Sequence, residues 1–362
     1  MISLATGAGA GTGGHADGDT LSNIENITGS AHDDTLTGND ENNILIGGGG
    51  NDTITTGGGN NTVTAGAGDD TINVGNGVNH IDGGTGNDTV SFAAVTTIGT
   101  LSLDDIRTSN DPTDSFVVTG VAVDMGTGAV EGANILINVE NVTGTDRDDY
   151  LQGSDANEEF RGGAGNDILR GGGGVDTLHG GVGNDWLNGD AGDDALHGGE
   201  GDDWLIGGDG DNILNGGAGV NTLKGDAGDD IIAFFNGGQE TATGGAGADK
   251  FVINVLDRVG VSATEVDIIK DFKIGEDKIH IIGDIGNLSL EFIAADGSAE
   301  AHFLLKKGDN VLVKVETDAT AFTAATVFDL TTADHFQFAA DFAELTVSIG
   351  YDLSSYYTPD LL

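Results

Sequence analysis

The sequence predicts an all-β fold of short strands joined by glycine-rich turns. The main observation is a nine-residue repeat that runs without a slip from Gly162 to Asp203. In each repeat, positions one, two and four are mostly glycine, position six is aspartate and position eight is a large aliphatic residue. Glycine adopts backbone angles that a Cβ disfavours, and one aliphatic residue per repeat suits a strand with a single inward-pointing side chain. A six-residue turn followed by a three-residue strand explains every position.

The composition argues against a conventional globular core. The chain has 362 residues, of which 64 are glycine, only 37% are hydrophobic and 6% are aromatic. The formal net charge is −47, so mutual repulsion opposes a compact state and the repeats should be largely disordered without counterions. Because binding to nucleic acid depends on Lys and Arg, a chain this acidic is not expected to bind it.

The aspartate at position six suggests a calcium site. It places a carboxylate among the exposed carbonyl oxygens of the turn, and such oxygens are the ligands that Ca²⁺ prefers. The consensus GGxGxD-x-aliphatic-x resembles the RTX, or haemolysin-type, calcium-binding repeat. The resemblance implies a parallel β-roll, with Ca²⁺ ions held between turns that stack on the same edge. We therefore expect two tandem parallel β-rolls with β-rich lead-in and C-terminal capping segments.

Two related heptapeptides set the predicted domain boundaries. Asn23–Gly29 (NIENITG) and Asn138–Gly144 (NVENVTG) each precede a repeat array. The predicted division is listed from the N-terminus: 1–28, a partial lead-in; 29–91, the first roll; 92–143, a β-rich lead-in of the second unit; 144–249, the second roll; 250–330, a C-terminal β cap; 331–362, an export signal. The first lead-in is much shorter than the second, which favours a fragment of a longer array over an abbreviated natural terminus.

In the first array, position six alternates strictly between Asp and Asn. With two repeats per coil, every second repeat stacks on the same edge, so one edge carries only Asp and the other only Asn. We expect Ca²⁺ along the Asp edge and an amide ladder along the Asn edge, because Asn supplies an acceptor without a charge. Random drift at a tolerant position is the alternative explanation.

The second array runs from Gly144 to about Ala233, with one further turn at Gly244–Asp249. Here both edges carry Asp, so calcium is expected on both. The predicted metal ligands of the two arrays are Asp34, Asp52, Asp70, Asp88, Asp149, Asp167, Asp176, Asp185, Asp194, Asp203, Asp230 and Asp249.

Position seven should point outward, and Tyr150, Ile168, Trp186 and Trp204 share one face there. Either a neighbouring segment packs over this stripe, or Tyr150, Trp186 and Trp204 form an exposed contact surface for a cell-surface glycan or protein.

From Lys250 onward glycine becomes sparse and basic residues more frequent. The segment Asp267–Ile279 resembles the D-x-I-x-D-F-x-x-G-x-D-x-I element that follows RTX arrays. The resemblance implies a cap on the roll, followed by an uncleaved signal for type I secretion at 331–362. That tail contains apolar residues and neither Lys nor Arg. A capping β segment would also explain it.

No feature of the sequence indicates an enzyme. The chain lacks cysteine, an H-E-x-x-H zinc motif and a G-x-S-x-G nucleophile motif. It also lacks an apolar run of membrane-spanning length and a typical N-terminal signal peptide. We expect a non-enzymatic, secreted calcium-binding protein that acts at the cell surface or in the surrounding matrix, with the type I secretion apparatus as a partner. The alternatives are the C-terminal folding and secretion module of a longer RTX exoenzyme or adhesin, and a carbohydrate- or surface-binding module.

Overall fold

The computed structural model confirms an all-β protein. It describes residues 2–3, 24–95, 101–104, 115–118, 122–124, 134–235, 239–254, 266–273, 276–282, 288–293, 302–307, 310–317, 327–329 and 346–350, and every element there is a strand. None of these residues forms a helix that could span a membrane. The chain divides into two compact units, Met1–Val182 and Gly183–Leu362, and each is described separately.

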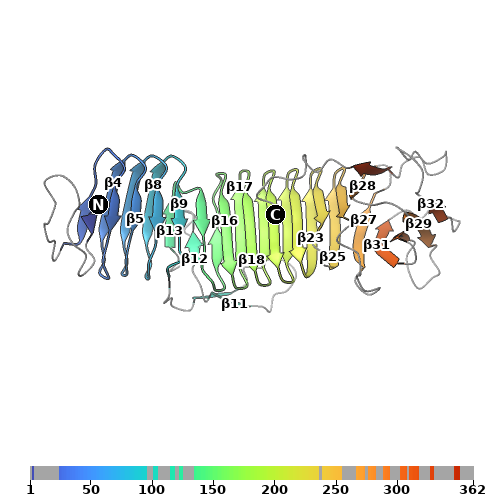
Figure 1. Ribbon diagram of the computed structural model, residues 1–362, viewed down its shortest axis with the longest axis horizontal. Helices are drawn as coiled ribbons and strands as arrows, with labels where there is room; N and C mark the ends of the chain where they lie inside the picture. Colours follow the sequence, from blue (N-terminus) through green and yellow to red (C-terminus); the bar gives the residue numbers. More distant parts are fainter. Residues whose placement is uncertain are drawn as a thin grey trace. The chain divides into compact units, whose positions relative to one another are not determined.

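Unit 1 contains two parallel sheets whose strands alternate along the chain (Figure 1). The strands of the first sheet are β1 (Ile2–Ser3), β3 (Thr35–Thr37), β5 (Thr53–Thr55), β7 (Thr71–Asn73), β9 (Thr89–Ser91), β14 (Asn141–Thr143), β16 (Glu159–Ala164) and β18 (Thr177–Val182). Those of the second are β2 (Asn26–Thr28), β4 (Ile44–Gly49), β6 (Thr62–Ala67), β8 (His80–Thr85), β13 (Asn134–Ile137), β12 (Ala122–Asp124), β15 (Tyr150–Gln152) and β17 (Ile168–Gly173). Two further strands, β10 (Leu101–Asp104) and β11 (Ser115–Val118), pair antiparallel.

Unit 2 repeats this arrangement and ends in antiparallel strands. Its first sheet contains β20 (Ala195–Glu200), β22 (Ile213–Ala218), β24 (Ile231–Phe234), β26 (Lys250–Asn254), β28 (Lys278–Ile282) and β33 (Thr346–Gly350). Its second contains β19 (Trp186–Ala191), β21 (Trp204–Asp209), β23 (Val220–Ala227), β25 (Gln239–Ala246), β27 (Asp267–Phe272), β31 (Asn310–Thr317), β30 (His302–Lys307), β29 (Leu288–Ile293) and β32 (Val327–Asp329). The pairs β31–β30, β30–β29 and β29–β32 are antiparallel.

Each coil comprises two repeats, so residues 18 apart lie side by side. Leu36 pairs with Ile54 in one sheet, and Leu45 pairs with Val63 in the other. The position-eight side chains of both arrays point inward and have no exposed surface, which confirms the predicted aliphatic core: Leu36, Leu45, Ile54, Val63, Ile72, Ile81, Val90, Leu151, Phe160, Leu169, Leu178, Leu187, Leu196, Leu205, Leu214, Leu223 and Ile232.

Close stacking of the turns explains glycine at position two. Gly48 has φ +117°, and a Cβ on it would lie under 3.0 Å from the carbonyl oxygen of Ser30 in the preceding coil. A side chain there would therefore be strained and would also push the coils apart.

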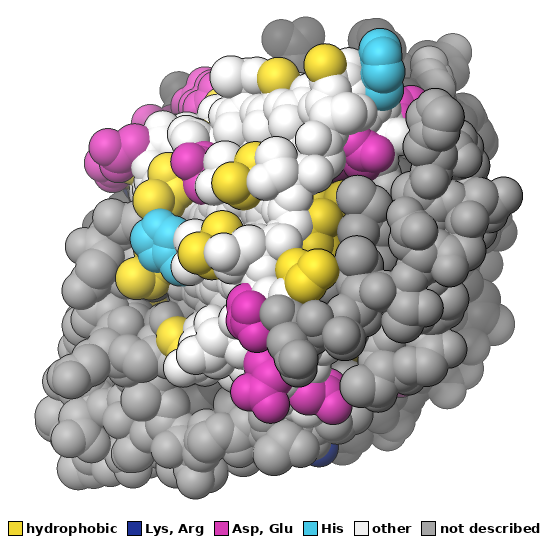
Figure 2. All heavy atoms as spheres, turned by 90° about the vertical axis from the view of Figure 1, so that its left-hand side faces the viewer, with side chains coloured by type: hydrophobic (Ala, Val, Ile, Leu, Met, Phe, Trp, Pro, Cys, Tyr) yellow, Lys and Arg dark blue, Asp and Glu magenta, His cyan; other side chains and the backbone are white. Residues whose placement is uncertain are grey.

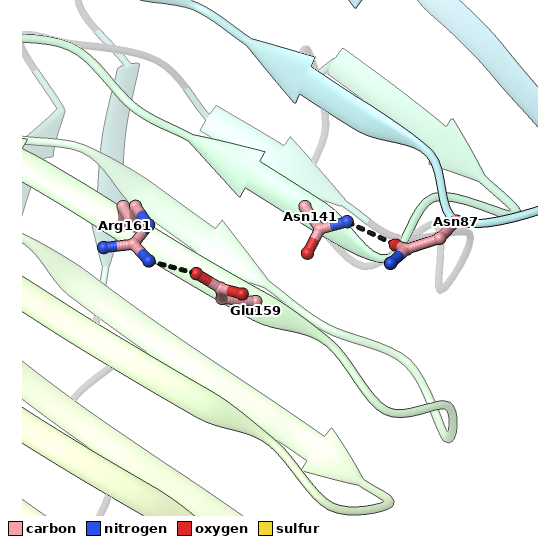
Figure 3. Close-up of polar contacts among 4 residues, drawn as sticks. All are labelled: Asn87, Asn141, Glu159 and Arg161. Atoms are coloured by element: carbon pink, nitrogen blue, oxygen red, sulfur yellow. Dashed lines mark hydrogen bonds and ion pairs between the residues drawn. The ribbon is translucent and has the colours of Figure 1, made fainter. Parts of the chain in front are cut away.

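The second heptapeptide forms a strand that joins the two arrays. β14 pairs with β9 on one side and with β16 on the other, so Val142 lines up between Val90 and Phe160. At this junction Asn141 Nδ2 donates a hydrogen bond to Asn87 Oδ1 at 2.6 Å, and Glu159 and Arg161 form an ion pair on β16 (Figure 3). The heptapeptide has the strand spacing of a repeat, and for that reason it continues the stack.

The D-x-I-x-D-F element of unit 2 also extends the stack. Phe234, Phe251 and Phe272 follow one another with ring centroids 6.4 and 6.0 Å apart. Beyond them, Ile279 on β28 pairs with Phe251. Of the predicted export signal, only residues 346–350 are described, as strand β33, and the rest lies outside the described residues.

Figure 2 shows the side of the molecule at the left of Figure 1. On the coloured residues of this side, acidic side chains recur and Lys or Arg are nearly absent. Apolar side chains form small separate groups on this side. This is expected because the core is thin and turns make up most of the protein surface.

Candidate metal sites

The position-six side chains form a ladder that links successive coils. In unit 1, Asp52 Oδ1 accepts a hydrogen bond from Asp34 N at 2.7 Å, and Asp70 Oδ1 accepts one from Asp52 N at 2.7 Å. Asp88 Oδ1 continues the series with Asp70 N at 2.8 Å. Each turn ends with a residue whose side chain completes the backbone hydrogen bonding of the coil before it.

The predicted ligands of the second array lie in equivalent ladders, one along each edge. Within unit 1, Asp167 Oδ1 accepts from Asp149 N and Asp176 Oδ1 accepts from Glu158 N, both at 2.8 Å. The corresponding bonds in unit 2, each between 2.8 and 3.1 Å, are Asp185 N to Asp203 Oδ1, Asp194 N to Asn212 Oδ1, Asn212 N to Asp230 Oδ1 and Asp230 N to Asp249 Oδ1. All of these side chains are buried.

The second carboxylate oxygen is what makes these turns candidate metal sites. It is buried and accepts no hydrogen bond in Asp52, Asp70, Asp88, Asp203, Asp230 and Asp249, nor in Glu158. Burying a carboxylate without a compensating partner is costly, so these oxygens call for a positive charge.

A carbonyl oxygen of the next coil lies close to this free oxygen. A Cβ built on Gly198 would lie under 3.0 Å from both Asp203 Oδ2 and the carbonyl oxygen of Gly216. The same holds at Gly225 for Asp230 Oδ2 and the carbonyl oxygen of Gly244. Glycine at position one therefore leaves a space on which a carboxylate and a carbonyl oxygen converge. This donor set fits Ca²⁺, which binds carboxylate and backbone oxygens together.

Side chains alone do not complete such a site. Across the described ranges, no group of three or more His, Cys, Asp or Glu side chains converges in a way that could hold a metal ion. Backbone carbonyls of the stacked turns would supply the remaining ligands. That arrangement suits calcium better than a transition metal, which favours His and Cys.

The raised pKa values of the position-six carboxyl groups also favour a bound cation. Burial raises the pKa of Asp88, Asp203 and Asp249 to about 6 and that of Asp230 to about 7. Neighbouring carboxylates add to the effect, for example Asp249 on the pKa of Asp230. A bound divalent cation would favour the ionised form and reverse this cost.

On the Asn edge, defined by the turns that end at Asn43, Asn61 and Asn79, the side-chain amides of Asn61 and Asn79 find partners within the chain, whereas Asn43 Nδ2 is buried without one. Asn61 Nδ2 donates to the carbonyl oxygens of Gly58 and Gly59, both at 3.1 Å. It also donates to Asn79 Oδ1 at 2.9 Å, which confirms the predicted amide ladder. An amide donor thus binds carbonyl oxygens of its own turn.

Position one also differs between the two edges. On the Asn edge it is Thr56 or Val74 in two turns, and both side chains are buried. On the Asp edge, defined by the turns that end at Asp34, Asp52, Asp70 and Asp88, it is Gly or Ala. In these two turns the Asn edge fills with larger side chains the region that the Asp edge leaves to Gly or Ala.

Two predicted ligands are already bonded within their own turns. Asp34 Oδ2 accepts hydrogen bonds from Ser30 N at 2.6 Å and Ser30 Oγ at 2.8 Å. Asp149 Oδ2 accepts them from Thr145 N at 2.6 Å and Thr145 Oγ1 at 3.1 Å. Because protein donors occupy these oxygens, Asp34 and Asp149 are the weakest candidates of the predicted set.

Several ladder residues were not among the predicted ligands. Asn134 Oδ1 accepts from Asn79 N and Glu140 Oε2 accepts from Asp88 N, at 2.8 and 2.7 Å. In unit 2, Asp267 Oδ1 accepts from Glu240 N and Asp277 Oδ1 accepts from Asp249 N, both at 3.0 Å. Asp277 could have been found from Gly275-x-Asp277-x-Ile279, which keeps the spacing of positions four, six and eight.

The predicted aromatic contact surface does not hold as a continuous stripe. Tyr150 is 3% exposed and Trp186 is 7% exposed, whereas Trp204 is 41% exposed. Position seven lies on the outer face of its strand, so the burial of Tyr150 and Trp186 means that other parts of the protein cover them. Of the three residues, only Trp204 offers an open ring.

A comparison with known families supports the identity of the repeats. The model of the RTX calcium-binding nonapeptide repeat (4 copies) matches residues 28–63, 55–90, 143–178, 170–205 and 206–233. A search of curated proteins finds no match. This match agrees with the stacked turns and their open carboxylate oxygens. The repeat arrays of this chain belong to the family of RTX calcium-binding nonapeptide repeats.

Proposed function

We propose that this chain is a non-enzymatic protein that leaves the cell through a type I secretion system and folds outside on binding Ca²⁺. The observation that carries the proposal is the buried, unbonded second oxygen of the position-six carboxylates, exemplified by Asp203 and Asp230. These turns need a cation to be stable, and the calcium concentration decides whether they obtain one.

The concentration dependence follows from mass action. A ligand that binds only the folded state stabilises it by RT ln(1 + [L]/Kd). With a Kd of about 10⁻⁴ M, in the range of extracellular modules, millimolar Ca²⁺ contributes about 1.4 kcal/mol per site. At about 10⁻⁷ M Ca²⁺ the same expression gives almost nothing. The repeats would therefore stay largely unfolded in the cytosol, in a form that can pass through a channel.

Export and an extracellular site of action are supported by the repeat family and by the segment that follows the arrays. RTX repeats are typical of secreted proteins, and the segment Asp267–Ile279 follows the arrays as the resemblance implies. We place the folded protein at the bacterial surface or in the surrounding matrix, where calcium is available.

Far-UV circular dichroism tests the folding switch. In EDTA we expect a mostly disordered spectrum, and on titration with Ca²⁺ a cooperative gain of β signal. Mg²⁺ at the same concentration serves as a control, since it demands a stricter octahedral geometry than stacked turns provide. A complete β spectrum in EDTA would overturn the proposal.

Secretion is tested separately. A chain truncated before residue 331 and the full chain are expressed with a type I secretion system, and the medium is assayed for each. Export of the full chain alone is expected, and equal export of both would contradict a signal at 331–362.

A further inference from the structure

The last nonapeptide turn of unit 2, Gly244–Asp249, is bonded by side chains of the coil that follows it. Asp271 accepts hydrogen bonds from Gly244 N to Oδ1 at 2.8 Å and from Gly245 N to Oδ2 at 2.9 Å. Lys273 Nζ donates a hydrogen bond to the carbonyl oxygen of Gly245. Both backbone polar groups of Gly245 are therefore held by charged side chains, an anion at the N–H and a cation at the carbonyl.

A cationic side chain at this place distinguishes the last turn from the earlier ones. The repeat turns of unit 2 are 189–194, 198–203, 207–212, 216–221, 225–230 and 244–249, and none of them contains Lys or Arg. In the turns that end at Asp203 and Asp230, the second carboxylate oxygen accepts no hydrogen bond from a protein group. At the last turn, Lys273 supplies an ammonium group to a turn carbonyl oxygen.

The groups that face this ammonium are acidic and mostly buried. Asp249 and Asp277 are both buried, and Asp271 is half-buried. Burial raises the pKa of Asp249 to about 6 and also raises that of Asp277, and the charge of Lys273 acts against the rise at both. Lys273 therefore lies close enough to compensate two carboxylates of the ladder.

The final ladder residue is also complete without a metal. Asp277 Oδ1 accepts from Asp249 N at 3.0 Å, and Asp277 Oδ2 accepts from Lys273 N at 2.7 Å. Lys273 thus contributes twice, through its backbone N–H to Asp277 and through its ammonium group to Gly245.

We propose that the Lys273 ammonium takes the place of a calcium ion at the last repeat turn, so that this end of the repeat stack closes without metal. The inference rests on the proposed function, in which the preceding turns bind Ca²⁺. A tethered ammonium is present at any calcium concentration and loses no translational freedom on binding. The closed end then provides a fixed coil on which the calcium-dependent coils of unit 2 assemble.

Hydrogen exchange in EDTA tests this directly. In the wild type we expect slowed exchange at Gly244 N, Gly245 N and the strands β26 and β28, with fast exchange in the calcium-dependent coils. Lys273→Met removes the charge and keeps most of the side chain, and it should abolish this protection. Lys273→Arg keeps the charge and should retain much of it.

Lys224→Met is the matched control. Lys224 is also in unit 2 but forms a surface ion pair with Asp226 at 2.6 Å, and its side chain is 48% exposed. This variant should exchange like the wild type.

Calcium stoichiometry, measured by isothermal titration, gives the second readout. Lys273→Met should bind one more Ca²⁺ per chain than the wild type, because it frees the carbonyl oxygen of Gly245 and removes the positive charge beside the unbonded Oδ2 of Asp249. Unchanged protection in EDTA, or an unchanged stoichiometry, would overturn the inference. Failure of the proposed function is seen independently, as a wild-type chain that binds no calcium at all.

Discussion

The Asp edge and the Asn edge of unit 1 differ by a single atom in the position-six side chain. Asp70 and Asn61 both accept a backbone N–H of the preceding coil through Oδ1. The second atom is an unbonded oxygen in Asp70 and an amide nitrogen bonded to carbonyls of its own turn in Asn61. The second oxygen of Asp70 therefore lacks a donor, whereas Asn61 carries its own. The comparison teaches that calcium dependence can be assigned turn by turn.

Exchanging the two edges should have the largest effect. The triple variant Asn43→Asp, Asn61→Asp and Asn79→Asp removes the amide donors and buries three carboxylates. Each substitution should cost about 1–3 kcal/mol in EDTA, the typical cost of an unsatisfied buried polar group. Urea unfolding followed by circular dichroism measures the loss.

The reciprocal variant, Asp52→Asn, Asp70→Asn and Asp88→Asn, is its control. It should gain stability in EDTA and lose calcium binding in unit 1. If both triple variants unfold like the wild type in EDTA, the assignment of the two edges is wrong.

Filling the space at position one should have the next largest effect. Gly198→Val would place a side chain against Asp203 Oδ2 and the carbonyl oxygen of Gly216. We expect at least a tenfold loss of calcium affinity at that turn, about 1.4 kcal/mol or more. Isothermal titration measures it. Val74→Gly on the Asn edge is the control and should lower stability without changing the number of bound ions, so a changed calcium count there would argue against the comparison.

The pH dependence of the metal-free protein should show a moderate effect. The pKa of Asp88, Asp203 and Asp249 is raised to about 6, and that of Asp230 to about 7, by burial. A raised folded-state pKa means that the folded state binds more protons than the unfolded state between about pH 4 and 7. Stability in EDTA should therefore be greatest near pH 4 and fall as the pH rises through 6 to 7.

Thermal unfolding in EDTA across this range measures the trend. With Ca²⁺ present the trend should reverse, because protons compete with the cation for the same oxygens. Stability that rises with pH in EDTA would contradict the burial of uncompensated carboxylates.

The smallest effect is expected at a turn closed by its own hydroxyl group. Thr145→Val removes the hydrogen bonds from Thr145 Oγ1 to Asp149 and keeps the side-chain shape. It should cost about 0.5–1.5 kcal/mol, the usual worth of such a bond. Thr177→Val, at a half-buried strand position, is the control. If Thr145→Val changed the calcium stoichiometry instead, Asp149 would have to be returned to the set of strong candidate ligands.

Much of the fold was predictable because the nine-residue period fixes the inward residue and the coil, although strands such as β19 (Trp186–Ala191) are six residues long where three were expected. Leu36, Leu196 and Leu223 all lie where the period places them. The division between Asp and Asn edges also followed from the spacing, since residues 18 apart must stack. The period likewise brought the predicted position-six residues into a ladder along each edge.

The remaining features depend on contacts that the period does not encode. Asn134 and Glu140 join the ladder more than 50 residues after their partners, so no local spacing reveals them. Ser30 and Thr145 lie at position two, where the repeat pattern does not distinguish one small residue from another. Their hydroxyl groups nevertheless decide whether the second carboxylate oxygen of Asp34 or Asp149 is free. The burial of Trp186 depends on tertiary packing, which a repeat pattern does not predict.

The hydrogen-bond ladder has a direction, and this makes the two ends of a coil stack unequal. In every ladder bond described above, the accepting side chain belongs to the later residue and the donating N–H to the earlier one. Asp34 N, for example, donates to Asp52, and Asp185 N donates to Asp203. Deleting the first coil of a stack would remove the N–H that donates to a position-six Oδ1, and would also remove acceptors of strand N–H groups, as Asp34 O accepts from Thr53 N. Deleting the last coil would instead remove the side chain that accepts the position-six N–H of the coil before it, so the two deletions expose different groups of the ladder.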